Sequence, residues 1–172
     1  MSYLGAPLSS QDQAWRTPPA FIKWLEDREG IKFDFDVCAS KENAKAPNYY
    51  TEVDNALSKH WSFDVGWMNP PFGHQLKHFL QKAVDSIDYY GELWVLIPAR
   101  TDTKYFHDLI VPYAERIIFL GGRINFQSSN ACGEPKANAP FPSMLVLFRR
   151  KFPKPIAEVD FAKLPKEARG MK

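Results

Sequence analysis

The segment Asn69-Pro70-Pro71-Phe72 carries the residues best suited to chemistry in this chain. A residue before proline is driven to extended backbone and proline fixes its own φ, so the following prolines restrict both Asn69 and Pro70. The Asn69 side-chain oxygen and the Pro70 carbonyl are therefore two rigid acceptors. They can take the two hydrogens of a primary amine conjugated to a ring. The amine lone pair is then drawn out of resonance and can attack an electrophilic methyl group without a strong base.

Phe72 adds a flat aromatic face to this segment. A flipped nucleobase can stack on such a face, which is worth about 1–3 kcal/mol, and the same ring favours a neighbouring sulfonium cation. A purely structural interpretation is also open, in which the two prolines only stop a strand and Phe72 is a core residue.

The elements around the segment place it at the end of a strand. Residues 63–68 read as a strand that runs directly into the prolines, which cannot extend a hydrogen-bonded ladder. Open α/β sheets bind their ligands at the carboxyl ends of the strands. Other strands are predicted at residues 33–37, 93–97, 116–120, 123–126 and 143–148, and helices at residues 17–29, 76–87 and 105–111.

Strands that alternate with helices, several of them apolar on both faces, predict an α/β fold with a mostly parallel sheet. The Thr17 hydroxyl is expected to cap the first helix and Gly30 to end it. Residues 127–141 contain Ser, Asn, Gly and Pro with few apolar side chains, which indicates a functional loop.

Length and charge suggest one domain with a basic end. We expect a single domain over residues 1–150 and a basic, weakly structured C-terminal tail over residues 151–172. The net charge is +2, but eight basic and three acidic residues occur from Arg149 onward. This end is either a phosphate contact or solubilising charge.

The remaining composition favours the cytoplasm. No apolar run approaches the ~20 residues that span a bilayer, so no membrane partner is expected, and the N-terminus lacks the pattern of a secretory signal. Cys38 and Cys132 have the spacing of neither a disulfide framework nor a zinc site.

Several separate segments together resemble the DNA N-6-adenine-methyltransferase family, the Dam-type enzymes of bacteriophages and prophages, over roughly residues 11–150. They are residues 11–18 (Gln-Asp-Gln-Ala-Trp-Arg-Thr-Pro), 34–40 (Asp-Phe-Asp-Val-Cys-Ala-Ser), 54–57 (Asp-Asn-Ala-Leu) with Trp61, 69–72, 98–101 (Pro-Ala-Arg-Thr) and 140–143 (Pro-Phe-Pro-Ser). The resemblance implies a Rossmann-like methyltransferase sheet with one late antiparallel strand, for which residues 143–148 are the candidate. It also implies S-adenosylmethionine as cofactor, double-stranded DNA as partner and the cytoplasm of a bacterial host.

The resemblance assigns the cofactor site residue by residue. By this resemblance, Trp15, Thr17 and Pro18 cover the methionine end of the cofactor, and Asp36 is the acidic residue that ends the first strand. The turn after that strand and Asn69 also face the cofactor. The turn lacks the usual glycines, so small side chains are expected to make the contact and Cys38 to be a packed neighbour. The residues so assigned are Trp15, Thr17, Pro18, Asp36, Cys38, Ala39, Ser40 and Asn69.

Asp54 and Leu57 resemble the pair that holds the cofactor's adenine, with the carboxylate accepting from an amine and the leucine packing on the ring. Whether Asp54 or Glu52 takes the ribose or the adenine stays open. Thr17 also keeps two interpretations, a helix cap and a cofactor contact.

Arg100, Thr101 and Arg123 follow strand ends and are candidates for phosphate contacts beside a flipped nucleotide, with ion pairs to Asp102 or Glu115 as the rival interpretation. His74 and His78 are helix neighbours, but no third ligand is apparent, so no metal site is expected.

Related segments occur in enzymes that methylate cytosine N4, RNA bases or protein glutamine, since each substrate presents a planar conjugated amine. A non-catalytic module that binds single-stranded nucleic acid through aromatic and basic residues is a further alternative.

Overall fold

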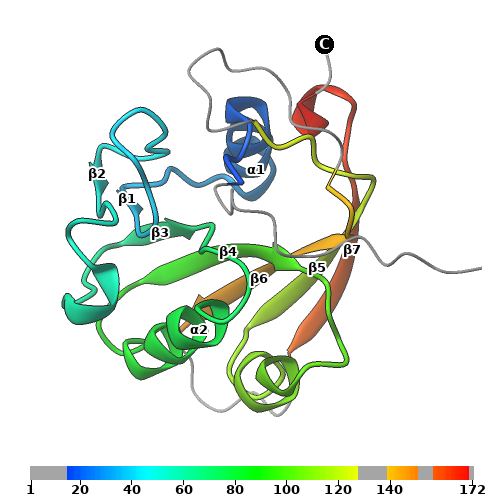
Figure 1. The fold of residues 1–172 in the computed structure, drawn as a ribbon. Coiled ribbons are helices and arrows are strands. Elements are labelled where there is room, and N and C mark those ends of the chain that lie inside the picture. The colour runs from blue at the N-terminus through cyan, green and yellow to red at the C-terminus, as the bar shows by residue number, and fades with distance from the viewer. Residues whose placement is uncertain (1–14, 128–138, 151–156, 171–172) are drawn as a thin grey trace, which may run out of the picture.

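The computed structural model describes residues 15–127, 139–150 and 157–170, which form one seven-stranded sheet with helices on both faces (Figure 1). The helical elements are α1 (Pro19–Glu29), η1 (Ala56–Ser58), α2 (Leu76–Asp85), η2 (Phe106–Ile110) and η3 (Glu167–Arg169). The strands are β1 (Phe35–Asp36), β2 (Asn48–Tyr49), β3 (Val65–Met68), β4 (Glu92–Pro98), β5 (Arg116–Gly121), β6 (Ser143–Arg149) and β7 (Glu158–Lys163).

The sheet has the order β2-β1-β3-β4-β6-β5-β7. Strands β2, β1, β3 and β4 are mutually parallel, and β7 is parallel to β5. Strand β6 is antiparallel to both of its neighbours, β4 and β5. The predicted α/β class, the mostly parallel sheet and the late antiparallel strand are therefore confirmed.

This topology brings the predicted site segments to the carboxyl edge of the sheet, which is the edge at which the parallel strands end. Strand β6 begins at the same edge, as the pairing of Ser143 with Pro98 at the end of β4 shows. The backbone N–H of Ala99 donates to the Pro142 carbonyl at 2.9 Å, which ties the loop after β4 to the segment that enters β6.

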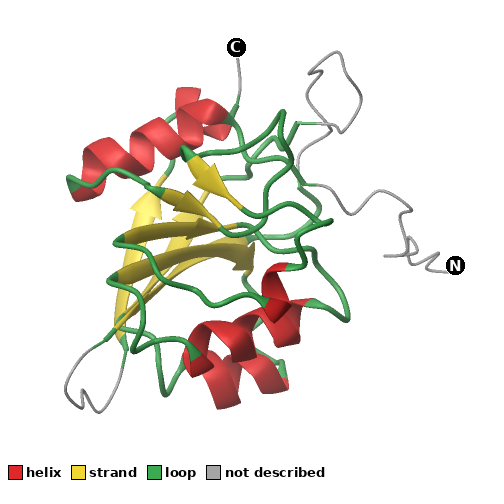
Figure 2. Ribbon diagram, turned by 90° about the vertical axis from the view of Figure 1, so that its left-hand side faces the viewer, coloured by secondary structure: helices red, strands yellow, loops and turns green. Residues whose placement is uncertain are grey.

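Two hydrophobic clusters cover the two faces of the sheet, and Figure 2 shows helices on either side of it. Helix α2 inserts Leu76, Phe79, Leu80 and Ala83 into one cluster, where η1 and η2 also pack. Helix α1 inserts Phe21, Ile22 and Leu25 into the other. Strand β4 is buried along its whole length between them, as expected for a central strand with apolar side chains on both faces.

The start of α1 differs from the sequence prediction. Proline occupies its first position and Gly30 ends it in the left-handed conformation, both as expected. The residue at the cap position, however, is Pro18, and no side chain caps the helix. Thr17 lies one residue earlier, and its hydroxyl accepts a hydrogen bond from Asn69 instead.

The prediction for the C-terminal region also needs correction. Residues 151–172 are not a weakly structured tail throughout, because Glu158–Lys163 form β7 and pair with β5 along its length. Residues 123–126 are not a strand, although Ile124 and Phe126 are buried, and the isolated bridge next to them joins Arg16 to Gln127. Most of the predicted functional loop at 127–141 lies outside the described residues.

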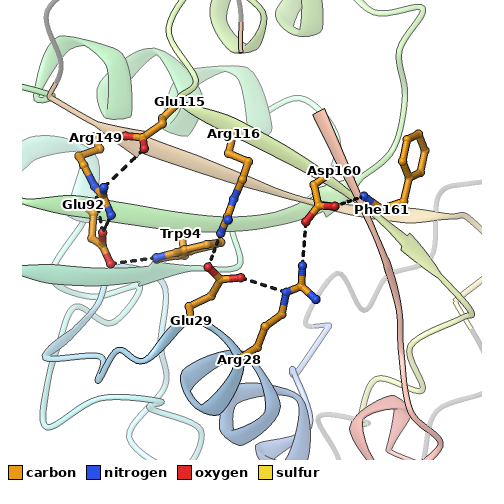
Figure 3. Close-up of polar contacts among 9 residues, drawn as sticks. All are labelled: Arg28, Glu29, Glu92, Trp94, Glu115, Arg116, Arg149, Asp160 and Phe161. Atoms are coloured by element: carbon orange, nitrogen blue, oxygen red, sulfur yellow. Dashed lines mark hydrogen bonds and ion pairs between the residues drawn. The ribbon is translucent and has the colours of Figure 1, made fainter. Parts of the chain in front are cut away.

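An ion-pair network occupies the edge of the sheet opposite the predicted site (Figure 3). Arg116 at the start of β5 pairs with Glu29 of α1 and lies over the Trp94 ring, 5.2 Å from its centroid. Arg149 at the end of β6 binds Glu92 of β4. The network joins α1 to the sheet where no site residue is predicted. Among the described residues, no helix is long and apolar enough to cross a membrane.

Candidate active site

The Asn69 side chain is held in one orientation at the end of β3. Its amide nitrogen donates to the Trp15 carbonyl oxygen and, at 3.2 Å, to the Thr17 hydroxyl. Its amide oxygen is buried and has no hydrogen-bond partner among the described residues. A buried acceptor without a partner is costly, so this oxygen is available to a donor from outside the chain.

Two aromatic rings contact Phe72. Trp15 lies over it in a stacked arrangement, with 6.4 Å between ring centroids and 27° between planes. Phe141 meets both Phe72 and Trp15 edge-on, each at 5.5 Å. Pro70 is buried and Pro71 and Phe72 are half-buried, so the segment is packed without being part of the deep core. The purely structural interpretation of Phe72 accounts for its packing but not for the unpaired Asn69 oxygen beside it.

Phe141 is the site residue that the sequence analysis did not assign. It belongs to the Pro-Phe-Pro segment at residues 140–142, which was noticed only as part of a family likeness. The position of this segment in the chain could have identified Phe141, because the segment leads into β6, which begins at the same edge of the sheet.

Asp36 closes β1 and is buried. Its carboxylate accepts from the backbone N–H groups of Cys38 at 3.1 Å and Lys45 at 2.9 Å. Burial raises the pKa of Asp36 to about 6, although both hydrogen bonds and the Lys45 charge oppose that rise. The carboxyl group therefore titrates close to physiological pH.

Ser40 lies in the turn after β1. Hydrogen bonds from the Glu42 backbone N–H and from the Ser40 side chain lower the pKa of the Glu42 carboxyl group. Cys38 and Ala39 are half-buried in the same turn, and the backbone N–H of Ala39 donates to Tyr50 at 2.9 Å. Burial raises the pKa of the Cys38 thiol well above its usual range, which agrees with an unreactive packed cysteine.

Asp54 follows β2 and is exposed. One carboxylate oxygen accepts from the Thr51 backbone N–H at 2.8 Å and from the Thr51 hydroxyl at 2.7 Å. These bonds lower the Asp54 pKa, so the group is ionised. Leu57 is half-buried against the core cluster of α2, and Glu52 is exposed. The Asp54 carboxylate thus stabilises its own turn through one of its two oxygens.

The three predicted phosphate contacts lie on the same edge. Arg100 and Thr101 follow β4, Arg123 follows β5, and all three are exposed. Neither arginine forms an ion pair within the described ranges. The rival interpretation fails for Glu115, which pairs with Arg149 at 3.4 Å.

His74 and His78 are both exposed near the start of α2. The part of the chain that the structure describes contains no group of three His, Cys, Asp or Glu side chains placed to hold a metal ion.

Comparison with known proteins identifies relatives in phages. The family model described as DNA N-6-adenine-methyltransferase (Dam) matches residues 6–171. A DNA N-6-adenine-methyltransferase of Haemophilus phage HP1 (strain HP1c1) is 34% identical over 145 residues, which cover 84% of this chain and 83% of that protein. A DNA N-6-adenine-methyltransferase of Escherichia phage T1 is 33% identical over 93 residues, covering 54% of this chain and 38% of that protein.

Among solved structures, the fold is similar to that of a Pyrococcus horikoshii protein described as a candidate RNA methyltransferase. The TM-score is 0.53 at 14% identity, and the match covers 80% of this chain and 87% of the other. At that identity the likeness concerns the fold, which is the Rossmann-like fold of methyltransferases.

Proposed function

This chain belongs to the DNA N-6-adenine-methyltransferase (Dam) family, and on that premise we propose that Asn69 to Phe72 form its catalytic segment. The protein is an enzyme that methylates adenine N6 in DNA, with a methyl donor as its second substrate. The finer proposals concern the donor, the form of the DNA and the residues that carry the reaction.

The observation that carries the proposal is the orientation of Asn69. Its nitrogen is committed to Trp15 and Thr17, and its buried oxygen has no partner among the described residues. In our proposal this oxygen and the Pro70 carbonyl accept the two N6 hydrogens of the target adenine. The nitrogen lone pair forms the new N–C bond, the donor's S–C bond breaks, and one N6 proton is released to water. By analogy with one preorganised donor of an oxyanion hole, each acceptor is expected to lower the barrier by about 2.7–4 kcal/mol.

We propose S-adenosylmethionine as the donor; when bound, it supplies the electrophilic methyl group. Asp36 and Ser40 offer a buried carboxylate and a hydroxyl for the polar groups of its methionine end. Trp15, Thr17, Pro18, Cys38 and Ala39 enclose that end, and Asp54 with Leu57 holds the adenine. The buried carboxylate of Asp36 supports this assignment, because the ammonium group of the ligand would compensate its charge.

The DNA substrate in our proposal is double-stranded, with the target adenine flipped out of the helix. N6 of a stacked, paired base cannot reach a donor bound at the sheet edge. The flipped base stacks on Phe72 and displaces Trp15 from that face. Arg100, Thr101 and Arg123 contact phosphates beside it, which their exposure and lack of ion pairs among the described residues support.

The proposal is tested by incubating the protein with S-adenosylmethionine carrying a labelled methyl group and with long duplex DNA, followed by mapping of the modified bases. We expect label on adenine N6 within a recurring short sequence. A matched single-stranded DNA and an RNA of the same sequence serve as controls. Label mainly on cytosine or RNA, or none on the duplex, contradicts the proposed substrate.

A further inference from the structure

The C-terminal turn is packed against the segment that orients Asn69. Helix η3 ends at Gly170, whose backbone is left-handed with φ +75° and ψ 23°. A Cβ atom at Gly170 would lie 2.8 Å from the Asn125 carbonyl oxygen and 2.9 Å from Pro18 Cγ. The first of these atoms belongs to the backbone and cannot rotate away. Only glycine therefore fits between Asn125 and Pro18 without displacing one of them.

Hydrogen bonds continue this contact along residues 125–127. The Asn125 backbone N–H donates to the Arg169 carbonyl at 2.7 Å. The Arg169 side chain folds back and donates from Nε to the Leu164 carbonyl at 2.9 Å, which closes the turn on itself. Two residues after Asn125, the Gln127 backbone N–H donates to the Arg16 carbonyl at 2.9 Å.

Arg16 lies between the two residues that hold the Asn69 amide. Trp15 accepts from Asn69 through its carbonyl oxygen, and Thr17 accepts through its hydroxyl. The Trp15 ring also meets the Phe126 ring edge-on at 5.5 Å. Residues 15–17 thus contact residues 126–127 on one side and Asn69 on the other.

We propose that residues 167–170 are a latch that sets the orientation of the Asn69 amide through residues 125–127 and 15–17. The latch contacts neither substrate, and its residues are positioning residues. Displacing it moves the Trp15 carbonyl and the Thr17 hydroxyl, and the Asn69 oxygen then no longer faces the reacting amine. This inference rests on the proposed role of Asn69 as an acceptor.

The test compares Gly170→Ala with Gly30→Ala. Gly30 has nearly the same backbone, φ +66° and ψ 35°, but a Cβ atom there meets nothing within 4 Å. In both variants an alanine must adopt the left-handed backbone conformation, which lowers stability in both, but only Gly170→Ala disturbs the latch. We expect kcat to fall about tenfold in Gly170→Ala and less than about twofold in Gly30→Ala, because small misplacements of reacting groups are costly. The dissociation constant for duplex DNA stays within about twofold in both.

A double-mutant cycle separates positioning from general loss of stability. In an Asn69→Ala background, measured by single-turnover methyl transfer, Gly170→Ala should change the rate less than about twofold, because the group it orients is gone. An equal loss in both backgrounds, or equal losses in Gly170→Ala and Gly30→Ala, overturns the latch.

Two further results distinguish the latch from the proposed function. Normal turnover in Asn69→Ala contradicts the proposed function, whereas an inactive Asn69→Ala beside a fully active Gly170→Ala contradicts the latch alone. If Gly170→Ala does not fold, Gly170→Asn replaces it with Gly30→Asn as control. Asparagine tolerates the left-handed backbone and still brings a Cβ atom against Asn125, so the same tenfold difference is expected.

Discussion

Two contacts decide which end of the Asn69 amide faces a substrate. The Trp15 carbonyl can only accept, so it binds the amide nitrogen, and the Thr17 hydroxyl accepts from the same nitrogen; the oxygen is thereby directed away from both. Sequence reasoning identified Asn69 from the prolines that follow it. It could not identify these two partners as its anchors, because they lie 54 and 52 residues earlier in the chain.

At Asp36, the position of the pKa leads to a prediction about cofactor binding. Burial raises the pKa to about 6, so the carboxyl group is neutral below that pH and ionised above it. If the ionised form binds the ammonium group of S-adenosylmethionine, affinity rises with pH through 6. We expect the dissociation constant measured by calorimetry to be about tenfold higher at pH 5 than at pH 7.

The matching variant for this pH effect is Asp36→Asn, which cannot ionise. Its dissociation constant should be nearly constant between pH 5 and pH 7. A wild-type protein with the same flat profile shows that Asp36 does not bind the cofactor's ammonium group.

Asp54 leads to a second prediction, because its carboxylate has both a structural and a proposed binding role. Asp54→Ala should raise the dissociation constant for S-adenosylmethionine by about tenfold, since a charge-assisted hydrogen bond is worth about 1.5–3 kcal/mol. DNA affinity should hardly change.

The control is Thr51→Val, which removes the hydroxyl hydrogen bond to Asp54 and keeps the carboxylate. It should alter cofactor affinity less than about twofold. An effect as large as that of Asp54→Ala assigns Asp54 to the turn alone.

Strands and helices differ in how clearly the sequence predicts them. The long apolar strands β4, β5 and β6 and the amphipathic helix α2 were predicted to within two residues, because burial on both faces or on one stripe leaves a clear pattern. Strand β1 lies within the predicted strand at residues 33–37, whereas β2 was not predicted, because its two residues are too few for a pattern.

Strand β7 was not predicted because only Ala162 in it is buried. Val159 and Phe161 are exposed, and its other side chains are polar or charged. The reverse error at residues 123–126 has the opposite cause. The alternating side chains Ile124 and Phe126 are buried like those of a strand. The backbone hydrogen bonds of this segment, however, go to isolated residues in different parts of the chain and not to successive residues of one strand, so no ladder forms.

The ion-pair network between α1 and the sheet supports a prediction about stability. Glu29 and Arg116 are largely buried, with 13% and 21% of their side chains exposed. Glu29→Gln leaves the Arg116 charge without its main partner. We expect the free energy of unfolding in urea to fall by about 1–3 kcal/mol, less than for a fully buried pair.

Asp27→Asn is the control, because it breaks the surface pair between Lys23 and Asp27 on the same helix, whose side chains are 77% and 65% exposed. It should change stability by no more than about 0.5 kcal/mol. Equal losses in the two variants contradict a special role for the network. Methyl transfer by both folded variants should be normal, since the network lies at the far edge of the sheet.

On the scale of the whole molecule, one edge of the sheet collects segments from several distant regions of the chain, whereas the opposite edge carries the ion pairs. Sequence reasoning predicted this edge because the carboxyl ends of parallel strands coincide. It did not predict that the C-terminal turn packs against segments that form this edge, because no periodic sequence pattern marks that contact.

DNA binding at this edge predicts that disrupted pairing helps. A duplex with an abasic site opposite the target adenine should bind more tightly than the intact duplex, because extrusion then costs less. Phe72→Tyr keeps the flat ring and should retain methyl-transfer activity, whereas Phe72→Ala should weaken binding of the flipped base by about 1–3 kcal/mol. With 2-aminopurine at the target, wild-type protein should brighten the fluorescence. A signal that stays dark while binding is confirmed separately means that the base remains in the helix.

The central claim is that the Asn69 oxygen acts on the reacting amine and not on binding, and the single-turnover rate of Asn69→Ala tests it most directly. With cofactor and duplex DNA both saturating, methyl transfer should be at least about 100-fold slower than in the wild type, because one of two preorganised acceptors is lost at a cost of about 2.7–4 kcal/mol. The dissociation constant for S-adenosylmethionine should stay close to that of the wild type. A folded Asn69→Ala protein that transfers methyl groups at a near-normal rate contradicts the claim.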